Sequence, residues 1–584
     1  MKKITVVVQS KDTKETLKSL RDLGVLHVEH QNVPVGDEVQ RLKLEMMRVA
    51  QATAVLADTE TQKHLRGNEQ HIADEIVSAL KEKKRIQDDM LKRQRHIDRW
   101  QEWGDFDPAL IEYFKNKNLR VHLAVIPEKR KKEIPEDIVT QILFKKSSSL
   151  YCALISQRDI KVPFEVLELP KERLGSVLKK QNSDREKIKK IDEKIHIYAQ
   201  YKRALNDYQE RLESILQFQE TLVGAGKSEM LSYVRGYIPY DSVVLLEEKS
   251  SHERWGLLIE EPDINDNVPT LIRNPRWVQI IKPVFDIIKA LPGYKEVDIS
   301  LWFLLFFSVF FGILIGDAGY GVIVLLLNLF LHRKLNKTLK DTRIFSLMYI
   351  LSATAIIWGV LTGTFFGQAW LVQRIEPLMP SLNNSRNMQA LCFFIGALHL
   401  SIAHLWKGLM KMPHLKSLSE IGWICMLWGA FFLARMLILS EVFPVFAKWL
   451  FIVGAGLIVL FSNPSRNVFK SVGLGFKDFL LNAVSSFTDV VSYIRLFAIG
   501  TATVAVADAF NQMAAGVGDG ILGGVITVII LLLGHTLNIA LGAMSILVHG
   551  LRLNVLEFSS HLGMEWSGSP YVPFKTKTQL TERK

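Results

Sequence analysis

The pattern of apolar and polar positions changes near residue 298 and divides the chain into two halves. Up to about Asp298, apolar residues recur singly among many Lys, Glu, Asp and Arg residues, which is typical of a water-soluble domain. From Ile299 onward, apolar stretches long enough to cross a bilayer follow one another. The pattern therefore predicts a cytoplasmic half, residues 1–298, and a polytopic membrane half, residues 299–584.

The soluble half begins with a small α/β unit. Residues 3–8 predict a strand, residues 12–22 predict a helix, and a second strand follows Gly24. Two further strand patterns, residues 119–127 and 149–156, stand much later in the chain. We therefore expect two small α/β lobes separated by intervening helical sequence.

Two charged helical segments, residues 37–100 and 171–222, bracket the second lobe. Their apolar residues recur at three- and four-residue spacing, which predicts a long antiparallel coiled-coil arm. At ~1.5 Å per residue, sixty residues would reach roughly 90 Å. The first seam is Val39, Leu42, Met46, Val49 and Leu56, with Thr53 in the missing position. The second seam is Ile188, Ile191, Ile195, Tyr198, Leu205, Tyr208, Leu212 and Ile215.

A short segment, Gly224–Ser228, resembles the end of a phosphate-binding loop. The glycine that such a loop requires five residues before Gly226 is Thr221, and the segment follows a helix instead of a strand. A loop at a helix end is the better interpretation. With no catalytic constellation elsewhere in this half, we expect neither ATP binding nor catalysis by this chain, and no cofactor or metal.

The first apolar stretch of the membrane half, residues 299–331, predicts a hairpin. One straight helix of that length would measure about 50 Å against a hydrocarbon core of ~30 Å. Basic residues flank both ends, including Lys289 and Lys295 before it and Arg333 and Lys334 after it. Because basic loops favour the cytoplasmic side, the stretch must enter and return, turning near Gly316.

The same loop-charge argument predicts eight membrane spans with both termini in the cytoplasm. Basic loops recur in alternate connections, whereas the loop around residues 516–520 has no basic residue. The predicted spans after the hairpin lie near residues 344–366, 389–411, 419–440, 445–462, 478–513 and 521–557.

Arg495 lies in the middle of the predicted span 478–513. A charged side chain at mid-membrane costs about 2.5–3.5 kcal/mol, so it needs a partner or water. Small residues follow at helical spacing on its face and would let another helix approach closely. They are Ala498, Ala502, Ala505 and Ala509. The alternative is a structural arginine that pairs within the bundle, with Asp489 or Glu557.

The last predicted span carries a stripe of small and polar residues. It consists of Asn538, Gly542, Ser545, His549 and Arg552, and His535 and Glu557 flank it. Polar faces on two successive membrane helices are typical of an aqueous ion path. The inference depends on the alignment of these positions, because a single histidine is more often only a hydrogen-bonding residue.

Charge and cysteine content exclude other classes of protein. The net charge of +12 suggests nucleic acid, but surplus Lys and Arg are also typical of cytoplasmic loops in membrane proteins. No zinc spacing or RNA-binding signature supports a nucleic-acid partner. Three scattered cysteines predict no disulfide framework. The apolar run near the N-terminus is too short for a signal peptide.

Several segments resemble the a/I subunit family of V-type and A-type ATPases, over essentially the whole chain. FFGILIGDAGYG, residues 310–321, is similar to the first membrane hairpin of that family, and the segment Trp358–Gly367 resembles its third span. SYIRL, residues 492–496, resembles the segment with the essential arginine. HGLRL, residues 549–553, with Glu557 resembles the last span, which carries a second functional arginine.

Two departures from the family pattern concern functional segments. Many relatives have proline after the acid of the approach to the membrane, where this chain has Ile299. Some carry an acid ten positions before the last-span arginine, where this chain has Gly542. The second departure leaves the polar chemistry of one half-channel open.

The resemblance implies a non-catalytic stator subunit of a rotary ATPase. Arg495 would face the ion-binding carboxylates of a rotor ring, with Ala498, Ala502 and Ala505 as the rotor-facing stripe. The ion path for H⁺ or Na⁺ would be lined by Arg552, Glu557, His549, Asn538 and Ser545. The implied partners are ring subunits, peripheral-stalk subunits and the central-stalk base, in a prokaryotic plasma membrane. The alternatives are a stand-alone ion transporter and a membrane-anchored coiled-coil tether.

Overall fold

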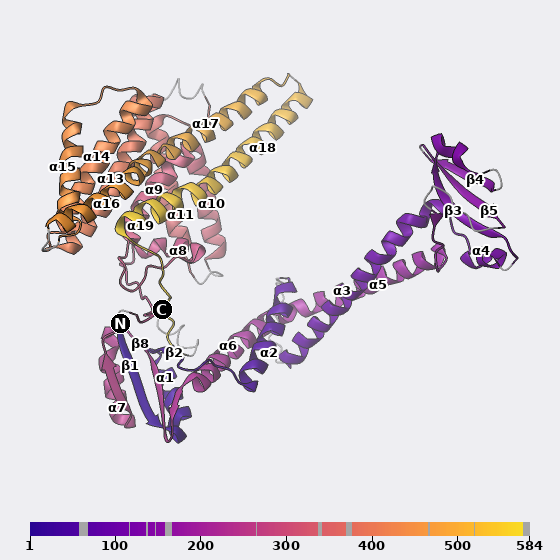
Figure 1. Ribbon diagram of the computed structural model, residues 1–584, viewed down its shortest axis with the longest axis horizontal. Coiled ribbons are helices and arrows are strands. Elements are labelled where there is room, and N and C mark those ends of the chain that lie inside the picture. The colour runs from indigo at the N-terminus through magenta and orange to yellow at the C-terminus, as the bar shows by residue number, and fades with distance from the viewer. Residues whose placement is uncertain are drawn as a thin grey trace. The chain divides into compact units, whose positions relative to one another are not determined.

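The protein is described by a computed structural model (Figure 1). The described residues are 1–57, 68–115, 117–135, 138–146, 148–157, 166–263, 265–336, 341–368, 377–464, 468–518 and 520–575. They form two compact units, and each is described by itself. The first unit consists of Met1–Lys2 and Glu260–Val572, and the second of Lys3–Ile259 and Pro573–Lys584. Residues 260–298 therefore pack within the unit that holds the apolar helices.

The second unit contains a sheet near the start of the chain. Its strands lie in the order β2-β8-β1-β9, with β7 on β8, and α1 and α7 connect strands. Alternating buried residues such as Ile4 and Val6 meet Leu17 and Leu20 of α1 in one core. The bounds are β1 Lys2–Gln9, α1 Thr13–Leu23, β2 His27–Glu29, β7 Gly226–Ser228, β8 Leu231–Ile238, α7 Val243–Glu253 and β9 Gly256–Glu260. The glycine-rich segment thus forms the end of a helix and a short strand.

Four helices of the second unit pair antiparallel, as Figure 1 shows for α3 and α5. Lys83 contacts Asp192, whereas Arg93, further along α3, contacts Asp184, which lies earlier in α5. The α2 and α6 helices pack against each other in the same core. The bounds are α2 Asp37–Val55, α3 Glu69–Trp100, α5 Leu174–Tyr198 and α6 Lys202–Gly224.

The apolar seams of these helices follow the predicted spacing with two differences. Val39, Leu42 and Val49 are buried, but Ala52 occupies the seam position that we assigned to Thr53. In α6 the seam runs from Leu212 to Leu216, and Ile215 is 45% exposed. A four-residue step fits a helix face as well as a three-residue step, so spacing alone did not decide between the two neighbours.

A second sheet follows α3 in the chain. Its strands lie in the antiparallel order β4-β5-β3-β6, and the predicted strands 119–127 and 149–156 correspond to β3 and β5. Ala124, Ile126, Cys152 and Leu154 form its small core. The bounds are α4 Pro108–Lys115, β3 Arg120–Pro127, β4 Val139–Lys146, β5 Ser149–Ser156 and β6 Val166–Leu167.

The first unit is a bundle of apolar helices around the phenylalanine-rich α9. Phe303, Phe307 and Phe310 are almost completely buried there. The bounds are α9 Ser300–Ile315, α10 Ala318–Leu335, α11 Arg343–Thr362, α13 Ser385–Lys411, α14 Ser417–Leu439, α15 Val445–Phe461, α16 Val468–Ser492, α17 Ile494–Ala515, α18 Ile521–Ser545 and α19 Ser559–Leu562.

Six of the described helices or continuous helix runs are long and apolar enough to cross a membrane. Two of them are the continuous runs Phe469–Ala515 and Ile521–Leu562. Two further apolar helices, α9 and α15, are shorter. These findings describe a membrane protein of helical class, and the count of eight spans stays a prediction.

The hairpin of α9 and α10 turns at the predicted position. Gly316 ends α9 in the left-handed region at a φ of 66°, which glycine adopts without steric cost. The Asp317 side chain then caps α10 by accepting a hydrogen bond from the Tyr320 backbone N–H. A second bond, from the backbone N–H of Gly367, fixes the same carboxylate against the loop after α11.

The approach to the membrane helices folds back on the bundle. A short 3₁₀ turn, Gln279–Ile281, leads into α8, Lys282–Ile288, and both pack against α11. Thr270 pairs with Pro570 in a parallel bridge, so the chain segment after the last helix returns to the same place.

Candidate functional site

Arg495 lies at the first turn of α17, directly after a break in a long helical run. The break is Tyr493, whose side chain is completely buried and whose hydroxyl lies 2.8 Å from His399 Nδ1 on α13. Gly396 permits this packing, because a Cβ atom there would lie 2.7 Å from the Tyr493 ring. The position of Arg495 is therefore set by the anchoring of its neighbour.

The Arg495 guanidinium faces a buried carboxylate from the last span. Its Nη1 atom lies 3.5 Å from Glu557 Oε1, and Arg552 Nε lies 3.5 Å from the same oxygen. The Glu557 side chain is 6% exposed, that of Arg495 is 22% exposed and that of Arg552 is 54% exposed. His549 interacts electrostatically with both arginines. The structure thus brings together Arg495, Glu557, Arg552 and His549. Arg495 pairs with Glu557, which is one of the two partners expected if this arginine has a structural role.

The pairing leaves polar atoms of Arg495 and Glu557 without a hydrogen bond. Arg495 Nη1 and Glu557 Oε2 are buried, and neither has a hydrogen-bond partner among the described residues. Buried charged groups in native proteins are normally fully hydrogen-bonded, so such atoms require an explanation. A partner carboxylate or water at this point would provide one.

The last span changes its helical geometry beside this cluster. After α18, residues Ile546–Gly550 and Leu553–Phe558 form π-helical turns. π-helical turns are rare in proteins as a whole, and those that occur are frequently found at functional sites. Their wider turn changes the direction of each following side chain, so the fourteen-residue alignment expected for a regular α-helix does not hold across them. Along this span, Arg552 is exposed whereas Asn538 is buried.

Asn538 belongs to a separate hydrogen-bonded group further along the bundle. Its Nδ2 donates to the Thr503 carbonyl at 2.8 Å and to the Tyr320 hydroxyl at 3.0 Å. Tyr320 in turn lies 2.8 Å from His535 Nδ1. Fourteen residues of α-helix correspond to about 20 Å, so Asn538 and Arg552 are far apart along the span. Ser545 lies between them and is half-buried.

The small residues after Arg495 lie on an open face of α17. Ala498, Ala502 and Ala505 are exposed, whereas Gly500 and Thr503 on the opposite side pack against α9. A Cβ atom on Gly500 would lie 2.5 Å from the Ile313 carbonyl oxygen. The helix therefore has one tightly packed face and one uncovered face of alanines that begins one turn after Arg495.

A chain of ionisable residues, not identified in the sequence, runs across the bundle on the N-terminal side of Arg495. Asp489 Oδ2 lies 3.0 Å from His561 Nε2, and His561 Nδ1 lies 2.8 Å from His404 Nε2. His404 Nδ1 lies 2.6 Å from Glu420 Oε2, and Lys411 donates to Glu420 Oε1 at 2.5 Å. His404 and Glu420 lie within predicted spans, so the rule that we applied to Arg495 would have identified them.

Cavities lie on both sides of Arg495 along α16 and α17. One of about 290 Å³ is lined by His404, Asp489 and His561, together with three serines. Another, of about 430 Å³, lies beyond Gly500 and is lined by Gln368 and Asp508 among apolar residues. Polar lining in both cavities is compatible with water. Arg495 lies between the two along the chain.

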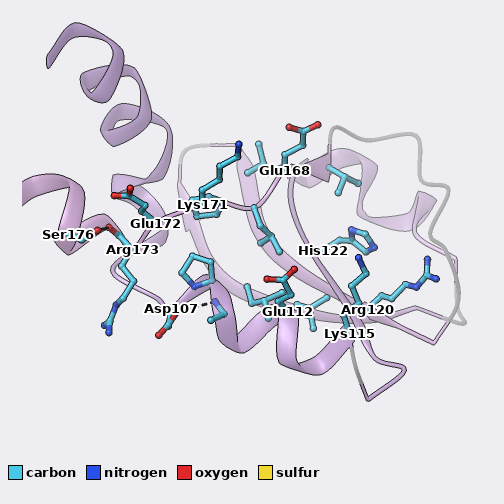
Figure 2. Close-up of a pocket in the computed structure, with 18 residues that line it drawn as sticks. Asp107, Glu112, Lys115, Arg120, His122, Glu168, Lys171, Glu172, Arg173 and Ser176 are labelled. Carbon is cyan, nitrogen blue, oxygen red and sulfur yellow. Dashed lines mark hydrogen bonds between the residues drawn. The ribbon is translucent and has the colours of Figure 1, made fainter. Parts of the chain in front are cut away.

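A third cavity lies in the second unit, beside the sheet of β3 to β6. It measures about 970 Å³. Figure 2 shows cations and carboxylates around it, including Arg120, Lys171, Glu112 and Glu168. Burial lowers the pKa of His122, and Arg120 lowers it further, which favours the neutral imidazole. The mixed lining fits a protein surface better than a small anionic or cationic ligand.

Comparisons with known proteins cover nearly the whole chain. It is 33% identical over 610 residues to the V-type ATP synthase subunit I of Borreliella burgdorferi, which covers 98% of this chain and 99% of that protein. It is 29% identical over 622 residues to V-type ATP synthase subunit I 1 of Treponema pallidum, covering 99% of each. An A-type ATP synthase subunit I from Methanocaldococcus jannaschii is 27% identical and covers 80% of this chain and 71% of its own length.

Comparisons with protein-family models and with solved structures show less similarity. No protein-family model matches the chain. Among solved structures, the cytoplasmic N-terminal domain of a V-ATPase subunit I, a homolog of subunit a, aligns at 11% identity with a TM-score of 0.22. That alignment covers 44% of this chain and all of the solved domain.

Proposed function

Because this chain belongs to the subunit I family of V-type and A-type ATP synthases, we propose that its membrane half forms two ion half-channels beside a rotor ring. Subunit I is the stator subunit of these complexes, and the catalytic work belongs to other subunits.

The rotor-facing surface is the uncovered alanine face of α17, headed by Arg495. This single observation carries the proposal. Ala498, Ala502 and Ala505 present little volume, so a helix of a ring subunit can approach closely. In this arrangement, the exposed part of the Arg495 guanidinium, whose side chain is 22% exposed, would meet the ion-binding carboxylate of the ring.

Arg495 would discharge the ring carboxylate as it passes. An arginine guanidinium stays protonated at any physiological pH, and an opposite charge nearby favours the ionised form of a carboxylate. An ion bound to that carboxylate is therefore released. The same positive charge opposes direct passage of a cation from one half-channel to the other.

The two polar regions beside Arg495 would serve as the half-channels. On one side lie Asp489, His561, His404 and Glu420 with their cavity, near the connection of α13 and α14 that carries Lys411 and Lys416. Basic connections favour the cytoplasmic side. On the other side lies the cavity with Gln368 and Asp508. Asn538, Ser545 and His549 lie along the last span between these regions.

Glu557 would hold Arg495 in place during the intervals when no ring carboxylate lies opposite it. It pairs with Arg495 and Arg552, so both guanidinium groups have a partial counter-charge when no ring carboxylate is opposite. Their 3.5 Å separations are long for charge-assisted hydrogen bonds, which leaves room for exchange of partners.

The paired helices and the two sheets of the second unit would anchor the stator against torque. Rotation driven by ATP hydrolysis on other subunits requires a stator held by the peripheral stalks. The mixed-charge cavity beside α4 and β3 supports a protein docking surface at the second sheet. We propose it as the place where a peripheral-stalk subunit binds, with the first sheet near the base of the central stalk.

Photocrosslinking tests the rotor-facing assignment. In a chain whose Cys152, Cys392 and Cys425 are replaced by alanine, Ala502→Cys carrying a photoactivatable maleimide is expected to give an adduct with the small ring subunit in the assembled complex. The matched control is Leu326→Cys on α10, a position that is 59% exposed. No ring adduct from position 502, or equal adducts from both positions, would remove the assignment.

A further inference from the structure

A cavity of about 740 Å³ lies where the membrane helices of the first unit begin. It is formed by the approach segment with α8, by the first residues of α9 and α11, and by the returning segment after α19. Figure 1 shows α8 beside the ends of these helices. Ser300 and Arg343, which line the cavity, stand at the N-termini of α9 and α11. The cavity therefore lies at the depth where a lipid headgroup region meets the protein.

Exposed side chains around the cavity fit this interfacial depth. Trp277 is 59% exposed and Ile287 is 66% exposed, although both belong to a folded segment that packs against α11. Tryptophan is enriched at membrane–water interfaces. The basic residues Arg333 and Lys334 at the end of α10 place these helix ends on the cytoplasmic side.

The lining combines an apolar wall with an excess of positive charge. Ile281 and Phe285 contribute apolar surface, and Lys282 and Lys289 contribute exposed ammonium groups. Neither lysine forms a close ion pair within the described part of the chain, and Lys282 interacts electrostatically with Asp341. Asp286 is the one carboxylate among the lining residues described.

Arg343 adds a guanidinium whose positive charge is paired with the carboxylate of Asp341. Its Nε donates to Asp341 at 3.1 Å, and its Nη1 donates to Gln279 at 3.5 Å. Lys282 and Lys289 carry two positive charges and Asp286 carries one negative charge, so the lining has an excess of one positive charge. A phosphodiester carries one negative charge. Thr270 adds a buried hydroxyl oxygen with no hydrogen-bond partner among the described residues, and Thr270 also lines the cavity.

We propose that this cavity binds the headgroup of an anionic phospholipid, with its phosphodiester held by Lys282 and Lys289. Basic pockets between membrane helices on the cytoplasmic side are suited to anionic headgroups. The apolar wall of Ile281 and Phe285 explains why a lipid fits better than a free phosphate, which gains nothing from apolar contact. The site would tie the approach segment to the bilayer, and it is independent of the ion path.

The test is photolabelling of the assembled complex in nanodiscs of phosphatidylcholine. The probe is phosphatidylglycerol with a diazirine on its acyl chain, and labelled peptides are located by mass spectrometry. We expect labelling in residues 270–291, with competition by unlabelled phosphatidylglycerol and no competition by added phosphatidylcholine. Each lysine near a charged headgroup contributes about fivefold, so Lys282→Gln with Lys289→Gln should raise the half-labelling concentration about thirtyfold.

The matched control is Arg333→Gln with Lys334→Gln. It removes the same charge from the same membrane face and leaves the cavity intact, so its labelling should equal that of the unmodified chain. ATP hydrolysis verifies that both variants are assembled. Equal labelling of the two double variants, or equal competition by phosphatidylcholine, would overturn the site. Displacement of the probe by inorganic phosphate alone would overturn the lipid assignment.

Discussion

Arg495 and Glu557 form a charge pair in the membrane half, with 3.5 Å between Nη1 and Oε1. The two residues come from successive membrane-embedded segments, and the carboxylate is almost fully buried. Charges removed from water are stable only when they are paired and hydrogen-bonded. Here the pairing is loose, and each residue keeps a buried atom without a hydrogen-bond partner among the described residues. The pair is therefore suited to open when a second carboxylate approaches.

Removal of the Glu557 carboxylate should slow transport. In Glu557→Gln, Arg495 and Arg552 lose their shared counter-charge, and Arg495 should hold each ring carboxylate more tightly. We expect ATP-driven ion uptake by vesicles to fall at least tenfold, with the complex still assembled. Glu441→Gln is the matched control, because it breaks the Arg435–Glu441 pair elsewhere in the same unit. Full uptake in Glu557→Gln would show that the pair has no role in transport.

A bulky side chain on the alanine face should obstruct the rotor. In Ala505→Trp, the indole would occupy the space that a ring helix needs. We expect both ATP hydrolysis and ion uptake to fall together, because a blocked rotor stops the whole cycle. Leu326→Trp places the same bulk on an exposed position of α10 and should change neither activity. Normal hydrolysis in Ala505→Trp would mean that this face does not meet the ring.

The chain of ionisable residues at His404 should be required for ion access. His404 links the Asp489 side of this chain to Glu420. Replacing it by glutamine in His404→Gln removes a group that can both accept and donate a proton. We expect at least a tenfold loss of ion uptake. His414→Gln, in the exposed connection after α13, should retain full uptake, and equal uptake in the two variants would contradict the assignment.

The paired helices of the second unit should depend on Leu205, which is completely buried in their core. Leucine-to-alanine substitutions in cores cost about 2–5 kcal/mol. In Leu205→Ala, amide hydrogens of α6 should exchange at least about thirtyfold faster, measured by mass spectrometry on the full chain. Leu44→Ala, at a position 56% exposed on α2, should change exchange very little. Unchanged exchange in α6 would show that this seam does not hold the helices together.

Much of the fold follows from periodicity and loop charge. The strands predicted at residues 3–8, 119–127 and 149–156 and the turn at Gly316 stand where the sequence places them, because each has a strong local signal, whereas β4, β6 and β7 were not predicted. The seam choices at Thr53 and Ile215 were wrong by one residue, because Ala52 and Leu216 are the buried positions. At those places two neighbouring positions fit the helix face, and only packing against the partner helix decides between them.

The candidate site could be predicted only in part. Arg495, Arg552 and Glu557 were found because ionisable residues in membrane segments are costly and therefore conspicuous. The distance of Asn538 from the arginine cluster follows from the fourteen residues between Asn538 and Arg552. The π-helical turns after Ser545 were not predicted, since they have no sequence signal that we recognised. The contacts among Asp489, His561 and His404 join distant segments of the chain, so no local pattern indicates them.

ATP-driven ion uptake by vesicles that carry Arg495→Ala tests the central claim most directly. Assembly is verified by co-purification of the ring and the ATP-hydrolysing subunits, and Arg333→Ala is the control for loss of an exposed basic residue. A protonophore and a sodium ionophore, applied separately, identify the ion that the unmodified complex moves. The account predicts that the assembled Arg495→Ala complex takes up no ion, whereas the control does. Unchanged uptake in Arg495→Ala would contradict it and would leave Arg495 as a structural partner of Glu557.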